Sequence, residues 1–313
     1  MIKSPSLKNS SYSCYCGNKF EKSFATKDFR YFTKGEYSYL QCSVCGIYKL
    51  KNTNIKYPKT YYSFKFKEKT KLMQKFTNFL YNLFFNKSSF FLRTIFLPFK
   101  PFLRGTIIKQ GASILDVGCG SGNFLSIMHD LGMKTCGIEP SLQAVKSAPK
   151  KLNIINSTIH NSKLPKRSFD VITMNHVFEH SDTPFTDIKK IKTYLKHSGT
   201  LILATPNTRS LAFKLFGKYW VQVSAPWHAY LFSNNNLISL LEKEGFSVKK
   251  IRYNSMPFQF LGSLSNYIYA KTGKTPKILS SRLFFYMFLP ICFFLNFFKF
   301  GDQFEIWLEK KTK

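Results

Sequence analysis

The stretch Ile114-Leu-Asp-Val-Gly-Cys-Gly-Ser-Gly-Asn-Phe-Leu125 decides the fold of this 313-residue chain. An apolar strand runs into three alternate glycines, Gly118, Gly120 and Gly122, and then into a helix. Glycines at such a turn remove the side chains that would block a ligand lying against the backbone. Asp116 at the strand end would repel a pyrophosphate, so the turn favours a cationic ligand over a dinucleotide.

Short apolar runs alternate with helical periods on both sides of this turn. This alternation is typical of βαβ units around a mostly parallel sheet. The strands predicted in this region are 114–117, 135–138, 153–155, 170–174 and 200–205, followed by 247–253 and 303–309. The sequence therefore predicts an α/β fold.

Composition divides the chain into three predicted parts. Residues 1–62 form a polar, cysteine-rich module, and residues 63–105 form a Phe-rich, basic helical linker or lid. Residues 106–313 form the α/β domain, with lid insertions at about 207–232 and 255–300.

The charge balance is strongly basic, with 47 Lys and Arg against 16 Asp and Glu, a net charge of +31. Such a chain is drawn to polyanions, but the excess is spread evenly along it and marks no single binding face. A hydrophobic content of 44% excludes wholesale disorder. The longest uncharged apolar run, 283–298, is shorter than the roughly 20 residues that span a bilayer. Because the N-terminus has no apolar signal core, we expect a cytoplasmic protein.

The quoted stretch resembles the first motif of class I S-adenosylmethionine (SAM)-dependent methyltransferases. Three further segments resemble the later motifs of that family in order: 135–140, 168–180 and 195–207. The resemblance implies SAM as the cofactor and a Rossmann-like sheet with helices on both faces. Glu139, 23 residues after Asp116, is placed to bind both ribose hydroxyls. The expected SAM-binding residues are Asp116, Gly118, Gly120, Gly122, Glu139, Asn161 and Asn175.

Asn161 is the weakest match in this set. In related enzymes an acidic residue after the third strand commonly holds the adenine amine, and here that region reads Ile159-His-Asn-Ser-Lys-Leu-Pro165. Asn161 or His160 could make the adenine contact instead.

Four cysteines near the N-terminus form two close pairs, Cys14-x-Cys16 and Cys42-x-x-Cys45, each followed by glycine. Four thiolates make a closed tetrahedral zinc site of the structural kind. The alternative is four free thiols. The first pair is irregular, because Ser13 stands where a Cys-x-x-Cys pair would begin.

The cysteine pairs, the tyrosines at 61 and 62, the class I core and a Trp…His-x-x-x-Phe-Ser element together resemble one bacterial subfamily. These zinc-knuckle SAM methyltransferases are linked to polysaccharide, sugar and secondary-metabolite pathways. The resemblance implies O-methylation of a saccharide or related small molecule, free or lipid-linked. Two alternatives stay open, an rRNA or tRNA methyltransferase and a C-methyltransferase of a nucleotide-linked sugar.

Two histidines are candidates for the base that removes the acceptor proton. His180 follows the fourth strand of the sheet, and His228 lies in the segment that covers the acceptor pocket in related enzymes. We expect Trp220, Trp227 and Tyr230 to form an aromatic wall around His228. The alternative for His180 is a hydrogen bond in the core at a helix start.

A metal-assisted variant uses His176, Glu179 and His180, which would share one helical face. Ubiquinone-pathway O-methyltransferases place metal-binding residues at matching positions, with Glu at the position of His176. A divalent ion there would lower the pKa of the acceptor hydroxyl.

Two segments are unusually rich in phenylalanine. Residues 79–103 carry nine aromatic residues and no acid, and residues 283–300 carry eight phenylalanines and one charge. We expect them to pack on each other as a lid. The alternative is an apolar, basic surface in peripheral contact with the inner face of the membrane. Nucleic acid is the less favoured partner, because no basic strip interleaved with aromatic residues stands out.

Overall fold

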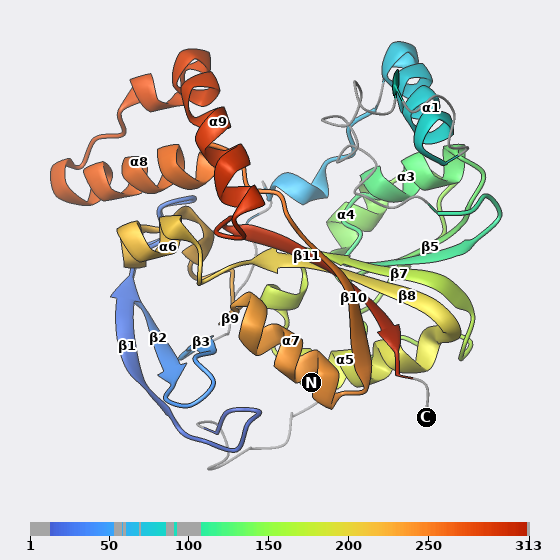
Figure 1. The fold of residues 1–313 in the computed structure, drawn as a ribbon, viewed down its shortest axis with the longest axis horizontal. Coiled ribbons are helices and arrows are strands. Elements are labelled where there is room, and N and C mark those ends of the chain that lie inside the picture. Colours follow the sequence, from blue (N-terminus) through green and yellow to red (C-terminus); the bar gives the residue numbers. More distant parts are fainter. Residues whose placement is uncertain are drawn as a thin grey trace.

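The computed structural model describes residues 13–52, 58, 61–68, 70–85, 91–92 and 108–311. A seven-stranded sheet flanked by helices forms the centre of this part of the chain, and a smaller antiparallel sheet stands beside it (Figure 1). Residues 86–90 and 93–107, which include much of the predicted linker, lie outside the described residues.

The central sheet is Rossmann-like, as the sequence predicts. Its strand order is β10-β11-β8-β7-β4-β5-β6. The five strands from β4 to β8 run parallel, while β11 is antiparallel to both β8 and β10. The strands are β4 (Ser113–Val117), β5 (Lys134–Glu139), β6 (Ile154–Asn156), β7 (Phe169–Asn175), β8 (Leu195–Pro206), β10 (Phe246–Tyr253) and β11 (Gln303–Lys310).

Helices cover both faces of this sheet (Figure 1). Helices α1 (Lys71–Phe85), α3 (Asn123–Asp130) and α4 (Leu142–Ser147) lie on one side, and α5 (Pro184–Tyr194) and α7 (Asn234–Lys243) lie on the other. In α5, Ile188, Ile191 and Tyr194 recur every three residues, so they share the face that packs into the core. The apolar period of each helix thus fixes which side turns to the sheet.

The second sheet joins two distant parts of the chain. Its order is β1-β2-β3-β9, where β1 (Phe20–Thr26), β2 (Tyr37–Cys42) and β3 (Tyr48–Leu50) come from the cysteine-rich module. The fourth strand, β9 (Tyr230–Leu231), comes from the first predicted lid insertion and pairs antiparallel with β3. The cysteine-rich module therefore completes its sheet with a strand of the α/β domain.

The second insertion forms a helical hairpin beyond the sheet edge. Helix α8 (Phe258–Thr272) is followed by the 3-10 turn η6 (Lys277–Ser280) and by α9 (Arg282–Phe297). Helix α6 (Leu211–Phe216) lies beneath α8 and packs against it (Figure 1). None of the described helices is both long enough and apolar enough to cross a membrane.

The expected packing of the two Phe-rich segments on each other is wrong for the described residues. Helix α1 packs through Leu80 and Phe84 against Phe124 and Met128 of α3. Helix α9 packs against α8 instead, and Figure 1 shows α1 and α9 at opposite ends of the upper side of the molecule. Local composition is similar in both segments, but each one finds a different tertiary partner.

A buried carboxyl group lies where the hairpin returns to the sheet. Asp302 precedes β11 and is 1% exposed, and neither carboxylate oxygen has a hydrogen-bond partner among the described residues. Burial penalises the charged form and raises the pKa of Asp302 to about 6, although the nearby Ser255, His176 and Gln222 act to lower it.

Replacing this aspartate should stabilise the protein at neutral and alkaline pH. The pKa of Asp302 is raised from 3.8 to about 6, so its contribution to stability is favourable below 3.8 and is lost as pH rises through 6. We expect Asp302→Asn to raise the free energy of unfolding by about 1–3 kcal/mol near pH 8 and by much less near pH 4.5. Urea unfolding at both pH values measures this, and an equal effect at the two would contradict it.

Candidate active site

A large cavity opens at the carboxyl ends of β4, β5 and β7. Its volume is about 970 Å³, within the range of sites that hold whole small molecules. The neighbours of β4 in the sheet are β5 and β7, so the order of the strands reverses beside it, which is where open α/β sheets bind ligands. The residues lining it include Asp116, Gly118, Cys119, Gly120, Glu139, Asn175, His176 and His180.

The glycine turn lets two other segments approach the cavity floor. Gly118 and Gly120 have φ angles of +67° and +56°, a region that favours glycine. A Cβ atom on Gly118 would lie 2.4 Å from Cγ2 of Val177, and one on Gly120 would lie 2.8 Å from the backbone oxygen of Ser63. The glycines therefore make room for the protein's own chain around the cavity.

Two carboxylates face this cavity from adjacent strands. Glu139 at the end of β5 accepts hydrogen bonds from the backbone N–H groups of Gly120 and Ser141, both at 2.8 Å. Asp116 in β4 accepts one from the Thr173 hydroxyl at 2.5 Å. Burial raises the pKa of Glu139, and the two backbone donors oppose that rise. Two carboxylates held in this way are suited to bind a ligand that carries hydroxyl groups and a positive charge.

The other predicted donor-site residues divide into two groups. Asn175 at the end of β7 lines the cavity, whereas Gly122 lies in the turn but not on the lining. Asn161 is exposed and does not line the cavity either.

The sequence did not predict one wall of the cavity, which we call its roof. It is formed by the segment around the 3-10 turn η1 (Tyr62–Phe64) and by the start of α1, through Tyr61, Ser63, Phe64 and Met73. Ser63 accepts a hydrogen bond from the backbone N–H of Ser121 at 3.1 Å. These residues straddle the predicted boundary between module and linker, and only the tyrosine pair at 61–62 hinted at their role.

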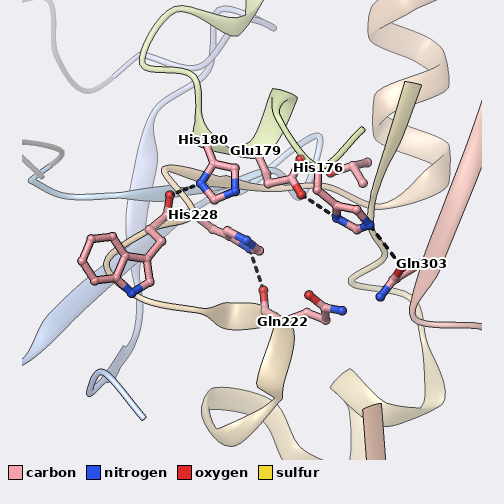
Figure 2. A network of polar contacts seen from close by, with 8 residues as sticks. His176, Glu179, His180, Gln222, His228 and Gln303 are labelled. Carbon is pink, nitrogen blue, oxygen red and sulfur yellow. Dashed lines mark hydrogen bonds and ion pairs between the residues drawn. The ribbon is translucent and has the colours of Figure 1, made fainter. Parts of the chain in front are cut away.

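The histidines at 180 and 228 lie together beside the cavity (Figure 2). Nδ1 of His180 donates to the carbonyl oxygen of Trp227 at 2.6 Å, and Nδ1 of His228 donates to that of Gln222 at 2.8 Å. A carbonyl oxygen only accepts, so each ring keeps its proton on Nδ1 and carries a lone pair on Nε2. The ring centroids are 4.7 Å apart, and His180 lines the cavity while His228 lies deeper.

A buried carboxylate stands beside this pair. Glu179 is fully buried and accepts hydrogen bonds from Nδ1 of His176 at 3.0 Å and from the Thr205 hydroxyl at 3.1 Å. Burial raises the pKa of Glu179, but His176 and the neighbouring histidines outweigh this and lower it to about 2. Burial lowers the pKa of His180, and lowers that of His228 to about 3. The site therefore holds an ionised carboxylate beside two neutral imidazoles at pH 7.

The expected helical face of His176, Glu179 and His180 is wrong. Only Phe178–His180 forms a turn, the 3-10 turn η3, and His176 precedes it with a φ of +54°. The side chain of His176 bridges Glu179 and Gln303, 3.1 Å from the Gln303 side-chain oxygen (Figure 2). The ligand atoms that do lie within 4.8 Å of one another belong to Glu179, His180 and His228.

The expected aromatic wall is only partly present. Trp220 packs against Phe213 in a core cluster, and Tyr230 stacks on Phe232 inside another. Trp227 alone of the three meets rings near the cavity, those of Tyr31 and Tyr61 at 5.4 and 6.3 Å. Spacing in the sequence could not separate the aromatic residue at the site from the two in the core.

The four cysteines of the N-terminal module converge on one point. Cys14, Cys16, Cys42 and Cys45 are all reduced, and their sulfur atoms lie within 4.8 Å of one another. The distances Cys14–Cys45 and Cys16–Cys42 are both 3.4 Å between sulfurs. Zinc–sulfur bonds of about 2.3 Å in a tetrahedron place sulfurs about 3.8 Å apart, so this donor set fits zinc.

The cysteine-rich module also holds the loop that carries His228. The hydroxyl of Tyr39 in β2 is completely buried and donates to the backbone oxygen of His228 at 2.6 Å. The backbone N–H of Leu50 donates to the oxygen of Ala229 at 2.8 Å. The position of His228 is therefore set by two β-strand residues of the module.

Sequence comparison shows the family of the chain. A family model described as "Methyltransferase domain" matches residues 92–251, just over half of the chain. The chain therefore belongs to this methyltransferase domain family.

The chain is also similar to curated ubiquinone biosynthesis O-methyltransferases. The mitochondrial ubiquinone biosynthesis O-methyltransferase of Schizosaccharomyces pombe is 31% identical over 113 residues, 33% of this chain and 41% of that protein. The ubiquinone biosynthesis O-methyltransferase of Glaesserella parasuis is 29% identical over 159 residues, 45% of this chain and 67% of that protein. The chain thus matches between two fifths and two thirds of these relatives' lengths. Their names point to ubiquinone and not to the polysaccharide pathways of the expected subfamily.

Among solved structures, the chain is similar to a SAM-dependent methyltransferase from Archaeoglobus fulgidus, with 23% identity and a TM-score of 0.46. The match covers 74% of this chain and 99% of that one.

Proposed function

We propose that this chain transfers a methyl group from SAM to a hydroxyl of a small-molecule acceptor. The observation that carries the proposal is one cavity lined both by the anchored carboxylates Asp116 and Glu139 and by His180. Methyl transfer from a sulfonium needs alignment of donor and acceptor and removal of one proton. The two groups of residues match these two requirements.

The donor end of the cavity is assigned to the glycine turn and its carboxylates. Glu139 would accept from the ribose hydroxyls, with its oxygens already oriented by two backbone donors. Asp116 would face the positively charged part of SAM. When bound, SAM supplies an electrophilic methyl group on a sulfonium sulfur. Asn175 and the backbone of Gly118 and Gly120 complete the lining.

The acceptor end is assigned to the two histidines. His180 faces the cavity, so its Nε2 is the atom proposed to take the acceptor proton, with His228 as the second histidine of the pair. The ionised Glu179 would stabilise the imidazolium that forms, because opposite charges attract strongly at a buried site. An ion held by Glu179, His180 and His228 is the competing arrangement of these groups.

The acceptor class is proposed as a saccharide or a related ring-bearing molecule. Tyr61 and Phe64 line the cavity, and Trp227 packs on Tyr61, so the C–H face of a sugar or the face of another ring could pack on an aromatic surface there. The relatives' names, ubiquinone biosynthesis O-methyltransferases, support transfer to an oxygen of a small molecule. Incubation with methyl-labelled SAM and cell lysate tests this: label in small polar or solvent-extracted material supports the proposal, and nuclease-sensitive label in RNA refutes it.

Zinc is proposed to occupy the four-cysteine site and to act structurally. Four cysteines close the coordination shell, so no position is left for chemistry. Its link to catalysis would run through Tyr39 and Leu50, which fix the His228 loop.

Removing the Glu139 charge should weaken donor binding. Glu139→Gln keeps the shape but loses the strong acceptor, and we expect the affinity for SAM to fall about tenfold or more, about 1.4 kcal/mol. Titration calorimetry measures this, with Asp130→Asn at the surface as the control. Equal affinity for the wild type and Glu139→Gln would remove Glu139 from the donor site.

Removing the proposed base should slow the chemical step and leave SAM binding intact. We expect His180→Gln to lower kcat about 100-fold or more.

Metal analysis of His228→Gln tests the competing arrangement, in which Glu179, His180 and His228 hold an ion. Wild type and variant should both hold one zinc per chain, and a second equivalent present only in the wild type would favour a bound ion at the histidines.

Loss of the structural metal should abolish methyl transfer and leave the binding of SAM intact. Cys45→Ser is expected to release zinc and to unfold the module, because metal binding supplies most of the folding energy of such a site. With Tyr39 displaced, we expect activity to be lost while SAM titration heat is retained. If activity survives in zinc-free protein, the module does not position His228.

A further inference from the structure

The hairpin of α8 and α9 carries an apolar surface that the rest of the described chain does not cover. Only Cys292 and Leu295 of α9 are buried, and both face the body of the protein. The exposed side includes Leu283, Tyr286, Met287, Phe293, Phe294 and Phe297, each 59–77% exposed. These positions recur at helical spacings of three, four and seven residues, so they share one face of α9, and an exposed apolar face of this kind marks a site of interaction.

The segment that carries this surface contains basic residues and no acidic ones. No Asp or Glu occurs between Glu244 and Asp302. Exposed basic residues lie at the end of α8 (Lys271), in the connection between the helices (Lys274 and Lys277) and at the first position of α9 (Arg282). Apolar side chains with a basic rim and no acid match the interfacial region of an anionic bilayer, where phenylalanines enter the acyl boundary and cations meet the headgroups.

We propose that the α8–α9 hairpin is a docking surface for an anionic lipid bilayer. Helix α9 has 16 residues, about 24 Å at 1.5 Å per residue, so it would lie in the interface and not cross it. A second copy of the chain is the less favourable occupant, because its hairpin would bring the same cations face to face. The proposal stands independently of the methyl-transfer reaction.

Docking through the hairpin would orient the protein so that an acceptor in the bilayer could reach the cavity. In Figure 1 the hairpin and α1 project from the same side of the molecule, with the η1 segment between them. Met73 of α1 lines the cavity, and its neighbour Leu72 is 78% exposed. Docking through the hairpin would turn the cavity roof toward the bilayer, where an amphiphilic acceptor resides.

Vesicle flotation with the full-length protein tests the proposal. We expect binding to vesicles containing phosphatidylglycerol and weak binding to phosphatidylcholine alone. The paired substitution Phe293→Ser and Phe297→Ser keeps the net charge and should lower binding about tenfold or more. Val44→Ser is the matched control, because Val44 is 68% exposed but lies in the cysteine-rich module.

Further measurements distinguish a lipid bilayer from a second copy of the chain as the partner of the hairpin. Phe293→Trp should show blue-shifted emission and quenching by brominated lipid when vesicles are added. Replacing Lys271, Lys274 and Lys277 with Gln should remove the preference for anionic vesicles. Equal flotation of the wild type and the Phe293→Ser, Phe297→Ser protein would overturn the proposal. So would a dimer in sedimentation that this substitution dissociates, because the occupant would then be a second copy.

Discussion

The hydrogen bond from Tyr39 to the backbone oxygen of His228 connects the two halves of the molecule at the candidate site. Tyr39 lies in the sheet that the cysteine cluster anchors, and His228 lies beside the cavity of the α/β domain. The hydroxyl is fully buried, and its other contact, with the backbone oxygen of Val223, is longer at 3.2 Å, so losing the bond to His228 would weaken the hydrogen bonding of a polar group in the core. The geometry of the histidine pair thus depends on the cysteine-rich module, although the glycine turn, Asp116 and Glu139 all belong to the α/β domain.

The same interdependence appears at the roof of the cavity. The backbone of Ser63 rests on the glycine turn so closely that Gly120 has no room for a side chain. Donor pocket, roof and histidine loop therefore come from three separate stretches of sequence that meet at one strand end. The shape of the cavity therefore depends on contacts between segments that are far apart in the sequence.

The sequence predicted what local pattern determines. The strand, glycine turn and helix around Asp116, and the strand ending at Glu139, follow from periodicity and turn chemistry, and the fold is confirmed. Pattern alone did not separate Trp227 from Trp220, because both are large aromatic residues in one insertion. Nor did it predict that His176 would turn away from a shared helical face, since its φ of +54° is imposed by tertiary contacts.

The pairing of β3 with β9 also constrains the order in which the chain can be assembled. The first three strands of the cysteine-rich module are synthesised before the central sheet, but its fourth strand is made only after most of that sheet. Such long-range pairing is slow to form, and β3 meanwhile presents an unpaired edge. A bound metal would hold the three early strands together during that interval, so the cysteine cluster would protect the nascent chain as well as the finished fold.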